Sequence, residues 1–120
     1  MATRREIVDA FVGGDAATVV GALAADATFR SPVADYQGRG QFAPVLQALA
    51  MVVTEAKVAS VHDGQGETVA FFAATVEGQR ADGVLRVVAG DQEPATELML
   101  MIRPLSTLLA GVKAMERALA

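Results

Sequence analysis

The stretch from Gly83 to Leu105, GVLRVVAGDQEPATELMLMIRPL, indicates more about the fold than any other part of the chain. It holds two apolar segments on either side of Gly-Asp-Gln-Glu-Pro, a run of residues that favours a turn. We therefore predict two strands, over residues 81–89 and 96–103, that are neighbours in an antiparallel sheet. Pro104 ends the second strand, because proline has no N–H group to donate to a neighbouring strand.

Three more strands are predicted before this pair. Segments 55–62 and 68–76 lie on either side of a glycine-containing turn and are rich in residues that suit a sheet. A shorter strand covers residues 27–31, where Phe29 and Ser31 share one face because successive strand residues point to opposite sides. The four long strands follow one another directly along the chain, which predicts an antiparallel meander.

Four other segments carry apolar residues at helical spacing. Thr3 and Glu6 have the spacing of a capping box, and Asp15 is a typical N-cap residue. The predicted helices cover residues 3–13, 15–26, 40–53 and 105–119. Two helices, a strand, a helix and then a run of strands indicate an α+β protein with an antiparallel sheet. A length of 120 residues suits one domain, which we assign to residues 1–120.

The composition excludes several classes of function. A net charge of −4 without any basic run argues against nucleic-acid binding, which depends on clustered lysine and arginine. The chain has no cysteine and one histidine, so we expect neither disulfides nor a metal site, and no cofactor. No apolar run is long enough to cross a membrane. We therefore expect a cytoplasmic protein that makes no contact with membranes or nucleic acids.

Both sides of the predicted meander are apolar. Leu98 and Leu100 alternate with Met99 and Met101, so neither face of that strand is polar. An antiparallel sheet in a small monomer usually shows a polar face to water. We therefore predict a homodimer joined sheet to sheet, with Phe72, Met99 and Met101 near the seam. The alternative is that the C-terminal helix covers this second face.

Three segments resemble a known family: FVGGDAATVVGALAADATFRSPV, YQGRGQF and GVLRVVAGDQEPATELMLMIRPL. The helix pair, the DATF entry into the first strand and the GR before the third helix resemble the nuclear transport factor 2-like superfamily. The likeness is greatest to its SnoaL-like and ketosteroid-isomerase-like branches. The resemblance implies a cone-shaped α+β barrel of the cystatin-like kind, with a curved antiparallel sheet wrapped around helices. It also implies an apolar pocket inside the cone, and dimers.

The same resemblance implies three catalytic groups in a ketosteroid isomerase: a carboxylate base, a neutral acid and a tyrosine. The base precedes Pro-Val at the end of the first strand, where this chain has Ser31. The acid lies at the position of Gly83, and the tyrosine comes from the first helix at Ile7 or Phe11. None of these residues has the required group, so steroid isomerisation is not expected.

Tyr36, His62 and Asp35 remain as candidate catalytic residues. The resemblance implies a histidine–aspartate pair in SnoaL-like cyclases, and carboxylates with an arginine around a water in limonene-epoxide-hydrolase-like members. Each candidate has a structural alternative: His62 lies exposed beside a turn, Asp35 forms a turn and Tyr36 is a half-buried rim residue. Asp82 and Arg86 share a strand face and are expected to form an ordinary surface pair.

The predicted lining of the pocket combines inward-facing strand and helix positions with Tyr36 at the rim. These residues are Phe29, Ser31, Tyr36, Phe42, Val45, Leu49, Phe71, Ala73, Thr75, Gly83, Leu85, Leu98, Leu100 and Ile102.

Three functional hypotheses follow. The first is a SnoaL-like domain that binds a small hydrophobic molecule in the apolar pocket, without ketosteroid isomerase chemistry. The second is an isomerase, cyclase or hydratase that acts on a polyketide- or terpenoid-like substrate by general acid–base catalysis. The third is a structural dimer module whose interior is filled. Ionisable groups that converge on an open cavity would favour the enzyme.

Overall fold

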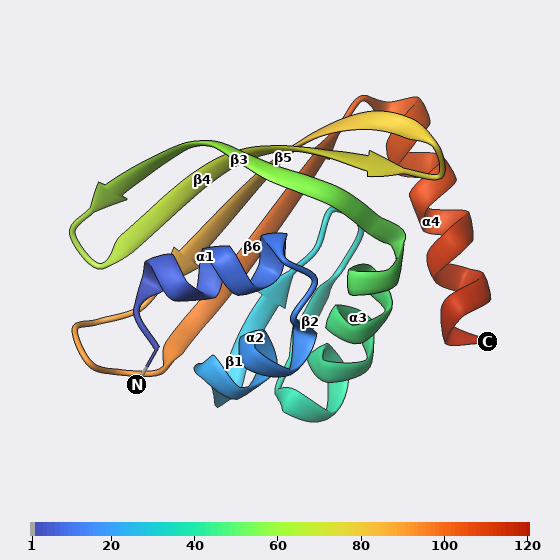
Figure 1. The fold of residues 1–120 in the computed structure, drawn as a ribbon. Coiled ribbons are helices and arrows are strands. Elements are labelled where there is room, and N and C mark those ends of the chain that lie inside the picture. Colours follow the sequence, from blue (N-terminus) through green and yellow to red (C-terminus); the bar gives the residue numbers. More distant parts are fainter. Residues whose placement is uncertain (1) are drawn as a thin grey trace.

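A computed structural model describes residues 2–120, and over this part of the chain six strands form one curved sheet accompanied by four helices (Figure 1). The helices are α1 (Arg4–Val12), α2 (Ala16–Ala22), α3 (Arg39–Val52) and α4 (Leu105–Leu119). The strands are β1 (Leu23–Arg30), β2 (Asp35–Gln37), β3 (Val53–Gly64), β4 (Glu67–Val76), β5 (Gln79–Val88) and β6 (Ala95–Arg103). The sheet arches over α1, while α2 and α3 fill the concave side and α4 stands beside α3 at one end. The predicted α+β cone is confirmed, as a sheet that curves without closing.

The sheet is mixed, in the order β2-β1-β6-β5-β4-β3. The four long strands form the predicted antiparallel meander, but β1 runs parallel to β6, with Phe29 opposite Leu98. The prediction of a purely antiparallel sheet is therefore wrong for this pair. No turn joins β1 to β6, so the sequence contains no local signal for their relative direction.

The first helix begins as its sequence predicts. The Glu6 N–H donates to the Thr3 hydroxyl at 3.1 Å, and the Thr3 N–H donates to the Glu6 carboxylate at 3.0 Å. The hydrogen bond from the Thr3 backbone N–H stabilises the charged form of the Glu6 carboxylate and lowers its pKa. The next helix is shorter than predicted: Asp15 caps it, yet it ends at Ala22, and β1 begins at Leu23.

Strand β2 was not predicted, because its three residues are too few for a recognisable pattern. It pairs antiparallel with β1, so that Tyr36 lies opposite Phe29 and Asp35 opposite Arg30. The segment that we interpreted as a turn therefore adds an edge strand to the sheet and fixes the position of Tyr36.

The two faces of β4 are the reverse of the prediction. Phe72 is 2% exposed and lies inside, 5.9 Å from the ring of Phe11, whereas Phe71 is 45% exposed on the outside. Phe72 is thus wrongly predicted at a dimer seam, although Met101, 49% exposed, lies on the outer face as expected. Both faces of β4 are apolar, and a shift of one residue exchanges them, so the pattern alone cannot orient this strand.

Helix α4 packs on the concave side of the sheet and not on the outer face. A Cβ added at Gly111 would lie 3.0 Å from a methyl group of Val76, which faces inward from β4. The alternative in which this helix covers the outer face is therefore wrong. None of the helices in residues 2–120 combines the length and the apolar character needed to span a bilayer.

A partly buried hydrogen-bond network joins the start of α1 to the far end of the sheet. The hydroxyl of Thr68, which is 0% exposed, donates to Asp63 at 2.6 Å and accepts from the Arg4 Nε at 2.9 Å. Arg4 also donates to the carbonyl of Ala89 at 2.9 Å. One guanidinium thus links α1, β4 and the end of β5.

Candidate functional site

A cavity of about 270 Å³ opens between the sheet, α3, α4 and the loop after β1. We call it the α4 cavity, because that helix forms one of its walls. It is lined by Ser31, Pro32, Val33, Tyr36, Val45, Leu49, Val52, Val53, Val76, Leu100, Ile102, Leu108, Gly111, Val112, Met115, Glu116 and Leu119. Nearly all of these side chains are apolar, so the cavity offers a hydrophobic surface with few groups that form hydrogen bonds.

Part of the predicted lining meets at this cavity. The members that line it are Ser31, Tyr36, Val45, Leu49, Leu100 and Ile102. They come from the loop after β1, from β2, from one face of α3 and from the inner face of β6. The structure therefore brings these separate segments together at one cavity.

Four other predicted residues point inward but lie in the packed core. Phe29, Phe42, Leu85 and Leu98 are each 0% exposed and do not line the α4 cavity. Their side chains fill the interior between α1, α3 and the sheet. The cone is therefore open at the end beside α4, while these four side chains pack its interior.

The remaining predicted residues do not reach the cavity. Phe71, Ala73 and Thr75 lie on the outer face, because β4 has the opposite orientation to the one predicted. Gly83 faces inward, but the Phe72 ring rests on its Cα, and a side chain at Gly83 would overlap that ring. The position at which the resemblance implies a catalytic acid is thus occupied by a phenyl ring.

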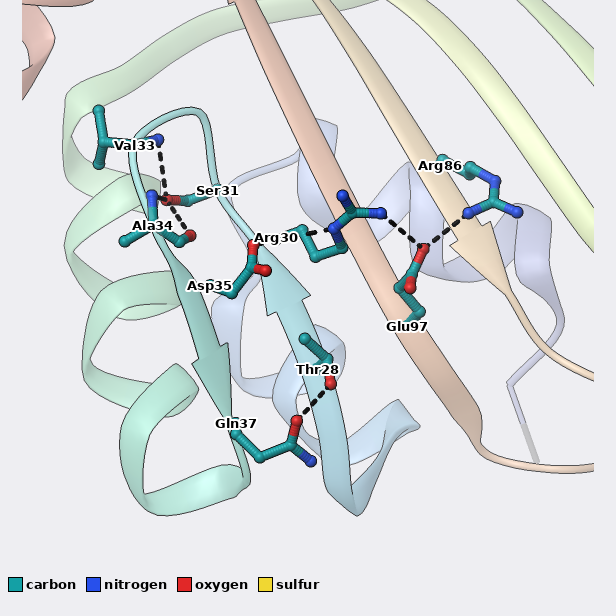
Figure 2. A network of polar contacts seen from close by, with 9 residues as sticks. All are labelled: Thr28, Arg30, Ser31, Val33, Ala34, Asp35, Gln37, Arg86 and Glu97. Carbon is teal, nitrogen blue, oxygen red and sulfur yellow. Dashed lines mark hydrogen bonds and ion pairs between the residues drawn. The ribbon is translucent and has the colours of Figure 1, made fainter.

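Ser31 lines the cavity, yet its hydroxyl is already engaged by its own loop. It donates to the carbonyl of Ala34 at 2.8 Å and accepts from the N–H groups of Val33 at 3.3 Å and Ala34 at 3.1 Å (Figure 2). These bonds hold the turn that leads into β2. No base lies among these partners, so the serine has no group to activate it as a nucleophile.

Tyr36 is the aromatic residue of the lining. Its ring stacks on Phe29, with the centroids 6.2 Å apart and the planes 22° from parallel. Its hydroxyl makes no hydrogen bond to any other group within residues 2–120, in contrast to the Ser31 hydroxyl. Tyr36 therefore combines a fixed ring with a hydroxyl that is free to bind a ligand.

The other catalytic candidates lie elsewhere. His62 is exposed on β3. Its ring packs edge-on against Phe71, with the ring centroids 5.7 Å apart, and its Nε2 lies 3.2 Å from the Ser60 hydroxyl. Asp35 is exposed and forms an ion pair with Arg30 at 3.8 Å. Neither residue lines the α4 cavity, so His62, Asp35 and Tyr36 do not converge on one site.

Charged residues on the outer face form a row across five strands, which begins at Asp35 on β2 and ends at Glu67 on β4. The Glu97 carboxylate lies 2.6 Å from the Arg86 guanidinium and 4.0 Å from that of Arg30 (Figure 2). The Arg86 Nε also binds the Glu67 carboxylate at 2.5 Å. The hydrogen bond to Glu67 raises the pKa of Arg86 further above its ordinary value. The expected pair between Asp82 and Arg86 does not form, because Asp82 binds Arg103 at 3.3 Å and Arg80 at 3.6 Å.

The α4 contribution to the lining was missed from the sequence. The helix itself was predicted from its apolar periodicity, but that pattern does not show whether such a face packs solidly or borders a space. Glu116 stands among these apolar residues and is the charged member of the lining. Within residues 2–120, no three histidine, cysteine or acidic side chains gather as a metal would require.

Comparisons with known proteins extend these observations. No protein-family model matches the chain, and no curated protein matches it. Among solved structures, a steroid delta-isomerase from Pseudomonas aeruginosa is similar, with a TM-score of 0.83 and 26% identity over 96% of this chain and 87% of that one. An uncharacterized bacterial protein with a cystatin-like fold from Silicibacter pomeroyi gives a TM-score of 0.78 and 22% identity over 91% of this chain and 79% of that one.

A third similar structure contains a small molecule. It is a hypothetical protein with a ketosteroid isomerase-like fold from Catenulispora acidiphila, in complex with trimethylamine. Its TM-score is 0.66, with 18% identity over 91% of this chain and 93% of that one. Other matching structures are NTF2-like proteins of unknown function. By its fold, the chain belongs to the NTF2-like, ketosteroid-isomerase-like superfamily.

Proposed function

We propose that the chain, as one domain, binds a small apolar molecule in the α4 cavity. The observation that carries this proposal is an open cavity of about 270 Å³ whose walls are almost entirely apolar. Pockets of this kind gain affinity by removing apolar ligand surface from water. The Tyr36 hydroxyl, which has no partner in residues 2–120, is available to orient a ligand through one hydrogen bond.

The volume suits a small ligand. At about 30 Å³ for each water-sized group, about 270 Å³ has room for about nine non-hydrogen atoms, the size of a phenylethyl compound. The trimethylamine complex of the Catenulispora protein supports a small ligand, because it places a small molecule on the same fold.

The structure supports the catalytic alternative less well than it supports binding. An isomerase, cyclase or hydratase needs an acid and a base within reach of one substrate. The lining contains Tyr36 and Glu116 as its ionisable residues, while His62 and Asp35 lie outside it. Although the chain is similar to a steroid delta-isomerase, its residues Ser31 and Gly83 do not supply that chemistry. We therefore propose binding and not turnover.

Filling the cavity is expected to abolish binding. Ile102→Trp places an indole in the space, and we expect affinity for 2-phenylethanol to fall at least about tenfold, since the ligand's apolar surface then stays in water. The affinities of the wild type and of Ile102→Trp for 2-phenylethanol are measured by two-dimensional amide NMR titrations. Val88→Ile, on the outer face of β5, is the matched control and should bind like the wild type.

Two results would contradict the proposal. The first is equal binding to the wild type and Ile102→Trp, with chemical shifts that do not map to the α4 cavity. The second is the absence of binding by any apolar probe of this size, together with no small molecule in mass spectra of the purified protein.

We also propose that two copies pair through the outer face of the sheet. Phe71 and Met101, 45% and 49% exposed, border a shallow apolar hollow that also includes Ala73 and Val84. Exposed patches of this kind mark association sites. Glu67 and Glu97, with their partner Arg86, lie toward one end of this face, and Arg80 and Arg103, with their partner Asp82, lie at the other. The first group carries a net negative charge and the second a net positive charge, which favours the two-fold arrangement in which β5 of the two copies runs in opposite directions.

A lysine in the middle of this face should separate the copies. We expect Met101→Lys to weaken the dimer at least about tenfold, because burying an unpaired ammonium group at an interface is costly. Sedimentation velocity over a range of concentrations measures the change. Leu109→Lys, which replaces an exposed leucine of α4, is the control and should leave the dimer intact. A wild-type protein that stays monomeric at its highest soluble concentration would refute the dimer.

A further inference from the structure

We propose that the molecule bound in the α4 cavity is an amine: an apolar body that carries one ammonium group, which pairs with the Glu116 carboxylate. This inference rests on the proposed function and adds the chemical class of the ligand. The lining of the α4 cavity carries a negative charge, because it contains Glu116 but no lysine, arginine or histidine.

Glu116 is not neutralised by its neighbours. Arg117, the next residue, points elsewhere and pairs with Glu77 at 3.5 Å. Lys113 lies one turn earlier on α4, and it forms no ion pair with Glu116 within 4.0 Å. Within residues 2–120, no basic side chain therefore forms an ion pair with Glu116, whereas Glu67, Glu97 and Asp82 on the sheet all pair with arginines.

The charge of the site and of the chain favours a cation over its neutral and anionic analogues. An ammonium group on an apolar body places its charge beside Glu116 while its carbon atoms cover the apolar wall. A carboxylate of the same size would meet Glu116 without any basic group to offset the repulsion. The net charge of −4 of the chain also attracts a cationic ligand, and it does so over longer distances.

The experiment compares three probes with the same body: 2-phenylethylamine, which is an ammonium ion at neutral pH, 2-phenylethanol and phenylacetate. At low salt we expect the amine to bind on the order of fivefold more tightly than the alcohol, which is the scale of an exposed ion pair. The carboxylate should bind more weakly than both. The preference for the amine should shrink toward equality at about 1 M salt, because salt screens exposed charges.

Two variants assign the effect to one residue. Glu116→Gln keeps the shape of the side chain but removes its charge, and it should make the amine and the alcohol bind equally. Glu93→Gln removes the same charge from the loop before β6, outside the cavity, and should retain the preference.

The outcomes separate this inference from the proposed function. If the alcohol binds in the cavity but the amine has no advantage, or if Glu116→Gln keeps that advantage, the amine assignment is overturned and apolar binding stands. If phenylacetate binds most tightly, the charge argument is wrong. If none of the three probes binds, the proposed function fails together with this inference.

Discussion

Gly83→Ala is expected to destabilise the protein by about 3 kcal/mol, at the upper end of what overpacking a core costs. Glycine is required here for space and not for an unusual backbone angle. The new methyl group would overlap the ring of Phe72. That ring cannot move away easily, because it is 2% exposed and already contacts Phe11.

The contact between Phe72 and Gly83 leads to a second, more specific prediction. If the Phe72 ring is the cause, Phe72→Leu should cost less in the Gly83→Ala protein than in the wild type. We expect the double variant to be more stable than the sum of the two changes by about 1–3 kcal/mol, as for other residues in direct contact. Urea unfolding followed by circular dichroism, at one fixed protein concentration, measures all four proteins.

Gly21→Ala is the control, because that glycine lies exposed in α2 with nothing within 4 Å of an added methyl group. It should stabilise the helix by up to about 1 kcal/mol. The placement of Phe72 over Gly83 is wrong if Gly83→Ala does not destabilise the protein. It is also wrong if the effects of Gly83→Ala and Phe72→Leu on the free energy of unfolding are simply additive.

Thr68→Val is expected to destabilise the protein by about 2 kcal/mol, although it replaces one buried side chain with another of nearly the same shape. The cost arises because valine can neither accept from Arg4 nor donate to Asp63. A partly buried donor that loses its partner costs about 1–3 kcal/mol. The lost bonds also release the start of α1 from β4, so amide hydrogen exchange should increase in α1 before it does in α3.

Thr75→Val provides the matched control on the same strand. Thr75 lies on the outer face, and its hydroxyl makes no hydrogen bond with residues 2–120. We expect this change to be neutral or slightly stabilising, because β-branched valine suits a strand. Equal effects of the two substitutions would show that the buried network around Thr68 contributes nothing to stability.

The candidate site was only partly predictable, and the errors share one cause. Strand β6 was oriented correctly, since its leucines face the core and its methionines face outward. Strand β4 was oriented incorrectly, which put Phe71 inside and Phe72 outside. An alternating apolar pattern identifies a strand, but it orients the strand only when one of the two faces is polar.

The catalytic candidates were predictable as residue types but not as an arrangement. Asp35, His62 and Tyr36 each follow or end a predicted strand, and the sequence permits them to meet. The structure puts Tyr36 in the cavity, Asp35 beside Arg30 and His62 beside Phe71. Their separation depends on β2, whose three residues carry no periodic signal, and on the position of β3 at the edge of the sheet.

Local sequence features were enough to predict the four helices, the long strands and the α+β class, because capping residues, turn residues and apolar spacing act over a few neighbouring positions. The capping box at Thr3 and the break at Pro104 are examples. Three features could not be predicted from local patterns: the parallel pairing of β1 with β6, the orientation of β4, and the wall that α4 adds to the cavity. These features depend on contacts between residues far apart in the chain, where close packing selects one of several arrangements that the local pattern allows equally.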